Sequence, residues 1–215
     1  MGKGNAPGRG AHSASFFDRR QGRREPRRSI LILCGGTETE PRYFNALKQE
    51  LKLSSVRIEI KGTAWDPLKV VECAVARSRE SDGPHPVFDE VWCVLDAERA
   101  GTNPRFDPAV QTAQQGKIEL AVSNPAFEYW YLLHFTATDR PFQDADQLIE
   151  ELKGHLPAYE KSLSVFPVLY PRTEDACGRA EKLLAKHAGD GPFPNPCTLV
   201  FKLVKALQAL REFRY

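Results

Sequence analysis

The stretch that decides the fold is Ser29-Ile-Leu-Ile-Leu-Cys34, followed by Gly35-Gly36-Thr37. A continuous apolar run of this length is typical of a strand that is buried on both faces of a parallel sheet. The glycines indicate a turn. Thr39, Glu40 and Pro41 then predict a helix start with Thr39 as the N-cap residue. The segment therefore predicts the first strand and first helix of a βαβ unit.

The chain beyond this unit continues to alternate between strands and helices. Further strands are predicted over residues 56–60, 90–96 and 118–122, and helices from Asp66-Pro67, over 108–116 and over 125–135. This alternation indicates an α/β protein with a parallel sheet of about four strands. Beyond residue 136 the pattern becomes helical, over residues 145–152, 174–187 and 198–213. We interpret this part as a C-terminal helical elaboration of the same core.

Composition excludes several classes of protein. Of the 215 residues, 41% are hydrophobic and 27% are charged, which is typical of a globular chain and not of a collagen-like or wholly disordered one. No apolar run approaches the roughly 18 residues of a membrane-spanning helix, and no apolar stretch follows the N-terminal positive charges as in a secretory signal. The five cysteines include no CxxC pair, which argues against a disulfide framework and against a zinc site. We therefore expect a cytoplasmic protein without a membrane partner.

The N-terminal residues 1–28 are predicted to be a basic disordered arm, and residues 29–215 the folded domain. The chain has a net charge of +2, but residues 1–29 hold eight basic and only two acidic side chains. Such an arm can contact the phosphates of a nucleic acid, or it can be a solvated tail. The candidate nucleic-acid-binding residues are Arg19, Arg20, Arg23, Arg24, Arg27 and Arg28.

Two acidic residues follow the predicted strand over residues 90–96. In an open parallel sheet, ligands bind outside the carboxyl ends of the strands. Asp96 and Glu98 are separated by one residue at such an end, so their carboxylates can point the same way and share a hard cation such as Mg²⁺. The alternative is a turn aspartate followed by a solvated glutamate.

Two other segments carry polar residues near apolar ones. Gly35-Gly36 can cradle a phosphate at a helix N-terminus, but the Lys-Ser/Thr of a P-loop is missing. No Rossmann fingerprint appears either, which disfavours a small-molecule-binding doubly wound protein. Residues 123–135 surround Glu128 and His134 with aromatic side chains. They predict either an aromatic core helix with a surface acid and a satisfied histidine, or a helix whose first turn presents Glu128 at the active edge.

The chain resembles the RloB-like family in an ordered series of motifs. The match covers nearly all of the body, from residue 30 to about residue 210, and its most specific part is the Asn-Pro-x-Phe-Glu-x-Trp segment. The motifs are Gly36-x-x-Thr39-Glu40-Pro41-x-Tyr43-Phe44, Asp66-Pro67, Val91-Trp92-Cys93-Val94-x-Asp96, Asn124-Pro125-x-Phe127-Glu128-x-Trp130 and Asn195-Pro196-x-Thr198.

The resemblance implies a Toprim-like fold, as in topoisomerases, primases and nucleases of the OLD family. It implies a bacterial anti-phage defence protein similar to one half of an abortive-infection pair, with an ABC/SMC-like ATPase as partner. The implied activity is magnesium-dependent (or manganese-dependent) phosphodiester cleavage of DNA or RNA. The resemblance places Asp96 and Glu98 as metal ligands and Glu40 or Glu38 as a further ligand or base. Glu128 is implied as a supporting or additional ligand, and His134 and Lys161 as groups that handle phosphate or protons.

One position departs from the family pattern. Members usually read Cys-Glu-Gly where this chain reads Cys34-Gly35-Gly36, so the expected Toprim glutamate is replaced by Gly35. The leading hypothesis is a nuclease in which Glu38 or Glu40 replaces the missing acid. The alternative is a catalytically decayed subunit that binds nucleic acid or the ATPase.

Overall fold

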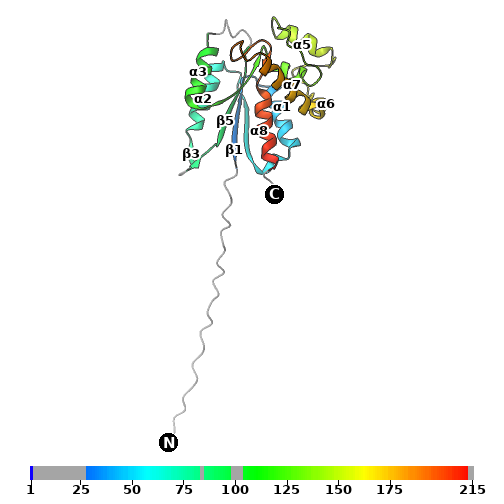
Figure 1. Cartoon of the computed structure of the whole chain (residues 1–215). Coiled ribbons are helices and arrows are strands. Elements are labelled where there is room, and N and C mark those ends of the chain that lie inside the picture. The colour runs from blue at the N-terminus through cyan, green and yellow to red at the C-terminus, as the bar shows by residue number, and fades with distance from the viewer. Residues whose placement is uncertain (2–27, 83–84, 98–103, 213–215) are drawn as a thin grey trace.

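The centre of the molecule is a five-stranded sheet (Figure 1). The computed structural model describes residues 1, 28–82, 85–97 and 104–212. In sheet order the strands are β2 (Arg57–Gly62), β1 (Ser29–Cys34), β5 (Glu90–Asp96), β6 (Glu119–Asn124) and β7 (Cys197–Thr198). The first four are parallel, and β7 runs antiparallel to β6. A separate two-stranded hairpin pairs β3 (Ser81–Asp82) with β4 (His85–Pro86).

Helices cover both faces of the sheet. One face carries α2 (Pro67–Ser78) and α3 (Phe106–Gly116), which pack against each other (Figure 1). The opposite face carries the remaining helices of the described chain. They are α1 (Thr39–Glu50), α4 (Glu128–Leu132), α5 (Ala145–Lys153), α6 (Phe166–Leu169), α7 (Thr173–Lys186) and α8 (Val200–Glu212), with short 3₁₀ turns at Leu53–Ser55 and Tyr170–Arg172.

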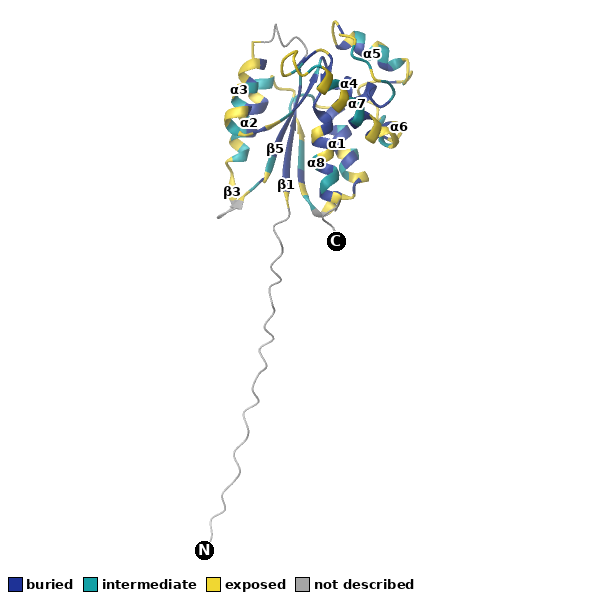
Figure 2. Cartoon of the chain, viewed as in Figure 1, coloured by how far each residue is buried: buried dark blue, intermediate teal, exposed yellow. Residues whose placement is uncertain are grey.

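Strand β1 is buried on both faces, as its uninterrupted apolar run predicts (Figure 2). Ile30 and Ile32 face the core under α1 and α8, whereas Leu31 and Leu33 face the core under α2 and α3. This division follows from the two-residue period of a strand. Because helices cover both sides, no position in β1 needs a polar side chain to meet water.

The order of the strands creates a switch point between β1 and β5. After β1 the chain turns into α1 on one face and adds β2 on one side. After β2 it passes through α2 on the other face and adds β5 on the opposite side of β1. The helices that follow β1 and β5, α1 and α3, therefore lie on opposite faces of the sheet. The carboxyl edge between two such strands is where open α/β sheets bind ligands.

The predicted α/β class and the four parallel strands are confirmed. Strand β7 is an addition that the sequence did not indicate, because only two residues pair and they follow a proline-rich segment. Thr39 as N-cap is wrong: Thr39 is the first helical residue, and Glu38 occupies the N-cap position without a side-chain cap. The helix predicted over residues 125–135 is also wrong in length, since α4 spans only Glu128–Leu132.

The C-terminal helices share the core of the sheet. Leu203, Val204 and Leu207 of α8 are fully buried in the same apolar cluster as Ile30 and Ile32 of β1. All five cysteines are free thiols. Within the described ranges, no helix combines the length and the apolar character that crossing a membrane requires.

Gly62, at the end of β2, allows this strand to lie against the turn after β1. A Cβ atom at Gly62 would come within 2.6 Å of the carbonyl oxygen of Gly36 and 2.7 Å of Cα of Thr37. These neighbours are backbone atoms, which cannot rotate away. Gly178 in α7 is a matched contrast, because a Cβ there would meet nothing within 4 Å.

We expect Gly62→Ala to lower the free energy of unfolding by about 1–3 kcal/mol, because it overpacks a rigid contact. Gly178→Ala should raise it by about 0.5–1 kcal/mol, because alanine favours a helix interior. Urea titrations of both variants measure the difference. Equal effects of the two substitutions would contradict the close packing of β2 on the Gly36-Thr37 turn.

Candidate functional site

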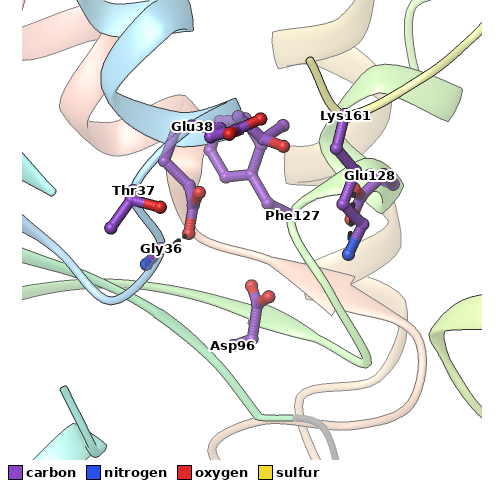
Figure 3. Close-up of a pocket in the computed structure, with 9 residues that line it drawn as sticks. Gly36, Thr37, Glu38, Asp96, Phe127, Glu128 and Lys161 are labelled. Carbon is purple, nitrogen blue, oxygen red and sulfur yellow. Dashed lines mark hydrogen bonds and ion pairs between the residues drawn. The ribbon is translucent and has the colours of Figure 1, made fainter. Parts of the chain in front are cut away.

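A cleft of about 290 Å³ lies at the carboxyl edge of the sheet, at the switch point between β1 and β5 (Figure 3). Four segments meet there: the turn from β1 into α1, the end of β5, the start of α4, and the loop between α5 and α6. The carboxylate of Asp96 points between the first turn of α1 and the Glu128–Lys161 pair. The lining residues are Gly36, Thr37, Glu38, Thr39, Glu40, Asp96, Phe127, Glu128 and Lys161.

Glu40 reaches back from the first turn of α1 to the end of β1. Its Oε1 accepts a hydrogen bond from the backbone N–H of Gly36 at 3.2 Å, and the side chain is buried. A Cβ atom at position 36 would lie 2.4 Å from Oε2 of Glu40, so the carboxylate occupies space that only a glycine leaves open. A carboxylate therefore lies at the end of β1 although position 35 has no side chain.

Asp96 is the last residue of β5, and its place follows from the alternation of that strand. Trp92 and Val94 face the core under α1, and Asp96 continues on the same face. Oδ1 of Asp96 is inaccessible to solvent and has no hydrogen-bond partner in the described structure. A buried oxygen without a donor is costly, which marks it as a group that can gain from a bound cation.

Glu128 begins α4 and is almost completely buried. It accepts a hydrogen bond of 2.9 Å from Oη of Tyr159 and lies 3.7 Å from Nζ of Lys161. Lys161 stays 58% exposed, and its carbonyl oxygen accepts a hydrogen bond from Arg42 of α1 at 3.4 Å. The loop between α5 and α6 thus supplies the one cation among the described residues that line the cleft.

Aromatic rings form the wall behind these groups. Phe127 packs edge to face on Tyr43 at 5.8 Å and on Tyr131 at 5.3 Å, and Tyr131 packs on Tyr159 at 6.0 Å. Oη of Tyr131 donates to the carbonyl oxygen of Thr39 at 3.5 Å. This cluster joins α4 to the first turn of α1 and holds the two acidic segments together.

Burial and neighbouring charges raise the pKa values of two carboxylates in the cleft, Asp96 and Glu40. Burial raises the pKa of Asp96 well above its ordinary value, and the nearby Glu40 and Glu128 raise it further, whereas Lys161 opposes the shift. The pKa of Glu40 is raised too, first by burial and then by Glu128, against its hydrogen bond from Gly36 and the charge of Lys161. A cation placed among these carboxylates would lower both pKa values, so cations and protons compete for the cleft.

The donor set fits a hard cation. Carboxylate oxygens from Glu40, Asp96 and Glu128 face a polar cleft, and Oδ1 of Asp96 lacks a partner. In the part of the chain that the structure describes, no three acidic, histidine or cysteine side chains are close enough together to form a metal cluster. Mg²⁺ does not require such a cluster, because it is commonly held by one or two carboxylates, with waters and substrate phosphates completing its octahedron.

The structure brings together five of the seven candidate catalytic residues that the sequence indicated. Glu38, Glu40, Asp96, Glu128 and Lys161 all line the cleft. Glu98, the candidate partner of Asp96, lies outside the described residues, as do Arg19, Arg20, Arg23, Arg24 and Arg27 of the arm.

Two further candidate residues, His134 and Arg28, are described by the structure and lie away from the cleft. His134 is buried in the aromatic core, with Nδ1 2.8 Å from the carbonyl oxygen of Trp130 and its ring 4.8 Å from that indole. Burial lowers the pKa of His134 to about 4, so the ring is neutral near pH 7. Arg28 precedes β1 and faces Glu90 at 3.6 Å, at the amino edge of the sheet.

No sequence pattern indicated a role for Tyr159. This residue lies in an irregular, proline-containing segment far along the chain from Glu128, and no periodicity or motif marks it. The role of Gly36 in making room for Glu40 was not predicted either. The pair Gly35-Gly36 indicated a turn or a phosphate cradle, whereas the structure uses Gly36 to leave room for the carboxylate of Glu40.

We expect Asp96→Asn to raise the melting temperature of the metal-free protein more at pH 8 than at pH 4.5. A carboxyl group whose folded pKa is raised contributes its full stability below its unfolded pKa, about 3.9, and loses it as the pH rises through the folded pKa. Asparagine cannot ionise and keeps that stability. Thermal melts in EDTA measure the effect.

Glu119→Gln is the control for this experiment, because Glu119 is exposed at the opposite end of the parallel strands. It should show no such pH dependence. A melting-temperature difference between Asp96→Asn and the wild type that stays constant from pH 4.5 to pH 8 would contradict the raised pKa of Asp96.

Comparison with known proteins identifies the family of the chain. The protein-family model described as RloB-like protein matches residues 30–207, which include every lining residue of the cleft. No curated protein and no solved structure gives a significant match. Because the match spans the described strands and nearly all of the helices, the chain belongs to the RloB-like family.

Proposed function

We propose that the protein is a cytoplasmic, magnesium-dependent phosphodiesterase that cleaves nucleic acid in bacterial anti-phage defence. The observation that carries this proposal is the convergence of Glu40, Asp96 and Glu128 with Lys161 in one cleft at the switch point of the sheet. Glu40 and Glu128 raise the pKa of Asp96 beyond the effect of burial, and Glu128 likewise raises that of Glu40, so these carboxylates are unfavourable together unless a cation or a proton joins them. Such sites are typical of metal-dependent phosphoryl chemistry.

Glu40 and Asp96 are the residues that would hold the ion. A bound Mg²⁺ supplies a Lewis acid that stabilises the negative charge of a phosphodiester and lowers the pKa of a bound water. Glu128 is suited to orient water, because Tyr159 and Lys161 hold its carboxylate in place. Lys161 is half exposed at the mouth of the cleft, where its charge can attract a substrate phosphate.

The wider role rests on the family resemblance. From it we propose a Toprim-like arrangement, a nucleic-acid substrate and an ABC/SMC-like ATPase as partner. The basic N-terminal residues support a polyanionic substrate, because arginine-rich segments bind phosphates without regard to sequence. The free state of all five cysteines is consistent with a reducing compartment.

A second candidate function is a binding subunit with a decayed site. Gly35 favours it, because the family pattern has a glutamate there. The hydrogen bond from Gly36 to Glu40 is the counter-argument, since it places a carboxylate at the end of the same strand. The two candidates differ in whether the wild-type cleft binds Mg²⁺ and cleaves.

We expect Mg²⁺ to raise the melting temperature of the wild type, and Asp96→Ala and Glu40→Gln to lose most of that rise together with nuclease activity. Each of these two substitutions removes one of the two carboxylates that we assign to the ion. Melts with and without MgCl₂, and cleavage of labelled DNA and RNA, measure both effects. Glu119→Gln, at the amino edge of the sheet, is the control and should behave as the wild type does. An equal Mg²⁺-induced rise in melting temperature in the wild type and all three variants would exclude the cleft as the metal site.

Gly35→Glu tests whether the missing family acid matters. The backbone of Gly35 is not left-handed, and a Cβ there would meet the carbonyl oxygen of Val94 at 3.7 Å and Cδ2 of Leu95 at 3.9 Å, which are ordinary contacts. We therefore expect this variant to fold and to show a larger Mg²⁺-induced rise in melting temperature than the wild type.

The outcome of Gly35→Glu also separates the two candidate functions. Cleavage that appears only in this variant would favour the decayed subunit, whereas wild-type cleavage that is lost in Glu40→Gln favours the nuclease. A folded Gly35→Glu protein with an unchanged response to Mg²⁺ would show that position 35 contributes no ligand.

A further inference from the structure

We propose that Trp65 is a stacking platform for an unpaired base, so that the cleft acts on a single-stranded nucleic acid. The inference rests on the proposed function and names the form of its substrate. Trp65 lies between β2 and α2, and it is one of three tryptophans in the chain. Trp92 and Trp130 are buried, at 6% and 0% exposure, whereas Trp65 is 40% exposed.

The backbone holds Trp65 in a defined position. Thr63 donates from both its N–H and its hydroxyl group to the carbonyl oxygen of Cys34, at 3.1 and 3.0 Å. The N–H of Trp65 donates to the hydroxyl of Thr63 at 3.3 Å, and the next residue, Asp66, caps α2 through the N–H of Lys69. An aromatic side chain on a fixed support loses little conformational freedom when it binds a ligand.

The same contacts place Trp65 at the edge of the sheet that carries the cleft. Cys34 ends β1, and Gly62 packs directly on Gly36 and Thr37, which line the cleft. Trp65 follows Gly62 by three residues, and three residues of extended chain span at most about 11 Å. A strand of nucleic acid that crosses the cleft can therefore place a neighbouring base on this indole.

The surroundings of Trp65 fit a nucleobase better than a protein partner. Ala64 and Asp66 on either side are exposed, and Leu163 and Val168, the other large exposed apolar side chains within the folded part of the described chain, belong to the segment around α6. A protein interface needs a contiguous apolar core, which a lone indole does not provide. Lys69 places its ammonium over the indole, 4.8 Å from the ring centre, so the platform combines an aromatic ring with a cation in contact with it. Single-stranded nucleic acids are bound by this combination.

Binding is tested with the full-length protein in EDTA and a fluorescein-labelled single-stranded oligothymidylate of about twelve nucleotides, within the usual range of site sizes. We expect Trp65→Ala to weaken binding at least about 5-fold, as the loss of one stacked base predicts. Trp65→Phe should recover part of the affinity. Neither variant should change the slope of log affinity against log salt, because no phosphate contact is removed.

A second readout comes from the indole itself. Because Trp92 and Trp130 are buried, acrylamide quenching of tryptophan fluorescence reports on Trp65. The oligothymidylate should protect Trp65 from acrylamide. Val168→Ala is the matched control, since Val168 is 45% exposed on α6 and should bind as the wild type does. Thermal melts establish that each variant is folded.

Four results would overturn the inference. Unchanged affinity in folded Trp65→Ala, or binding by the wild type without protection of Trp65, excludes the platform and leaves the proposed nuclease intact. Tight binding of a duplex that does not depend on Trp65, with no binding of the single strand, excludes a single-stranded substrate. Failure of the wild type to bind any nucleic acid rejects the substrate class of the proposed function as well.

Discussion

Burial of β1 on both faces is the constraint on which the rest of the structure depends. Each face needs a layer of helices, and the chain can supply both only if it crosses over β1 after adding β2 on one side. That crossing makes β1 and β5 neighbours whose following helices, α1 and α3, lie on opposite faces of the sheet. The crevice that holds Glu40 and Asp96 is therefore a consequence of how a fully apolar strand is covered.

The acidic cleft is costly to the folded protein, and its neighbours offset only part of that cost. Among the lining residues that the structure describes, Lys161 is the one cation, and it pairs with Glu128 at 3.7 Å. The Gly36 N–H group stabilises the carboxylate of Glu40, whereas Oδ1 of Asp96 receives no hydrogen bond from any residue that the structure describes. Stability is thus given up at the edge of the sheet where open α/β proteins bind ligands, which is typical of functional sites.

The two edges of the sheet differ in the groups they present. Asp96 and Glu40 lie at the carboxyl edge, and Arg28 lies at the amino edge, where β1 begins. The six residues of β1 separate these edges by about 20 Å. The acidic groups of the cleft and the cation of Arg28 therefore lie at opposite ends of the parallel strands.

The sequence by itself determined the four parallel strands and most of the helices, together with the side chains that they bury. The apolar run of β1, the carboxylate at the end of β5, and the Asp66-Pro67 start of α2 are local patterns, and local patterns follow from the geometry of a few neighbouring residues. The position of Asp96 was predictable for the same reason. The start of α1 was predicted to within one residue, because Glu38 and not Thr39 occupies its N-cap position.

Only the tertiary structure decided which groups meet at the cleft. Glu128 and Tyr159 are 31 residues apart and meet because α4 packs beside the loop after α5. Glu40 and not Glu38 reaches the end of β1, because the space above Gly36 is open to it. Strand β7 and the support of Trp65 likewise depend on distant backbone partners. Such contacts join residues far apart in the chain, and the period of a helix or strand carries no information about them.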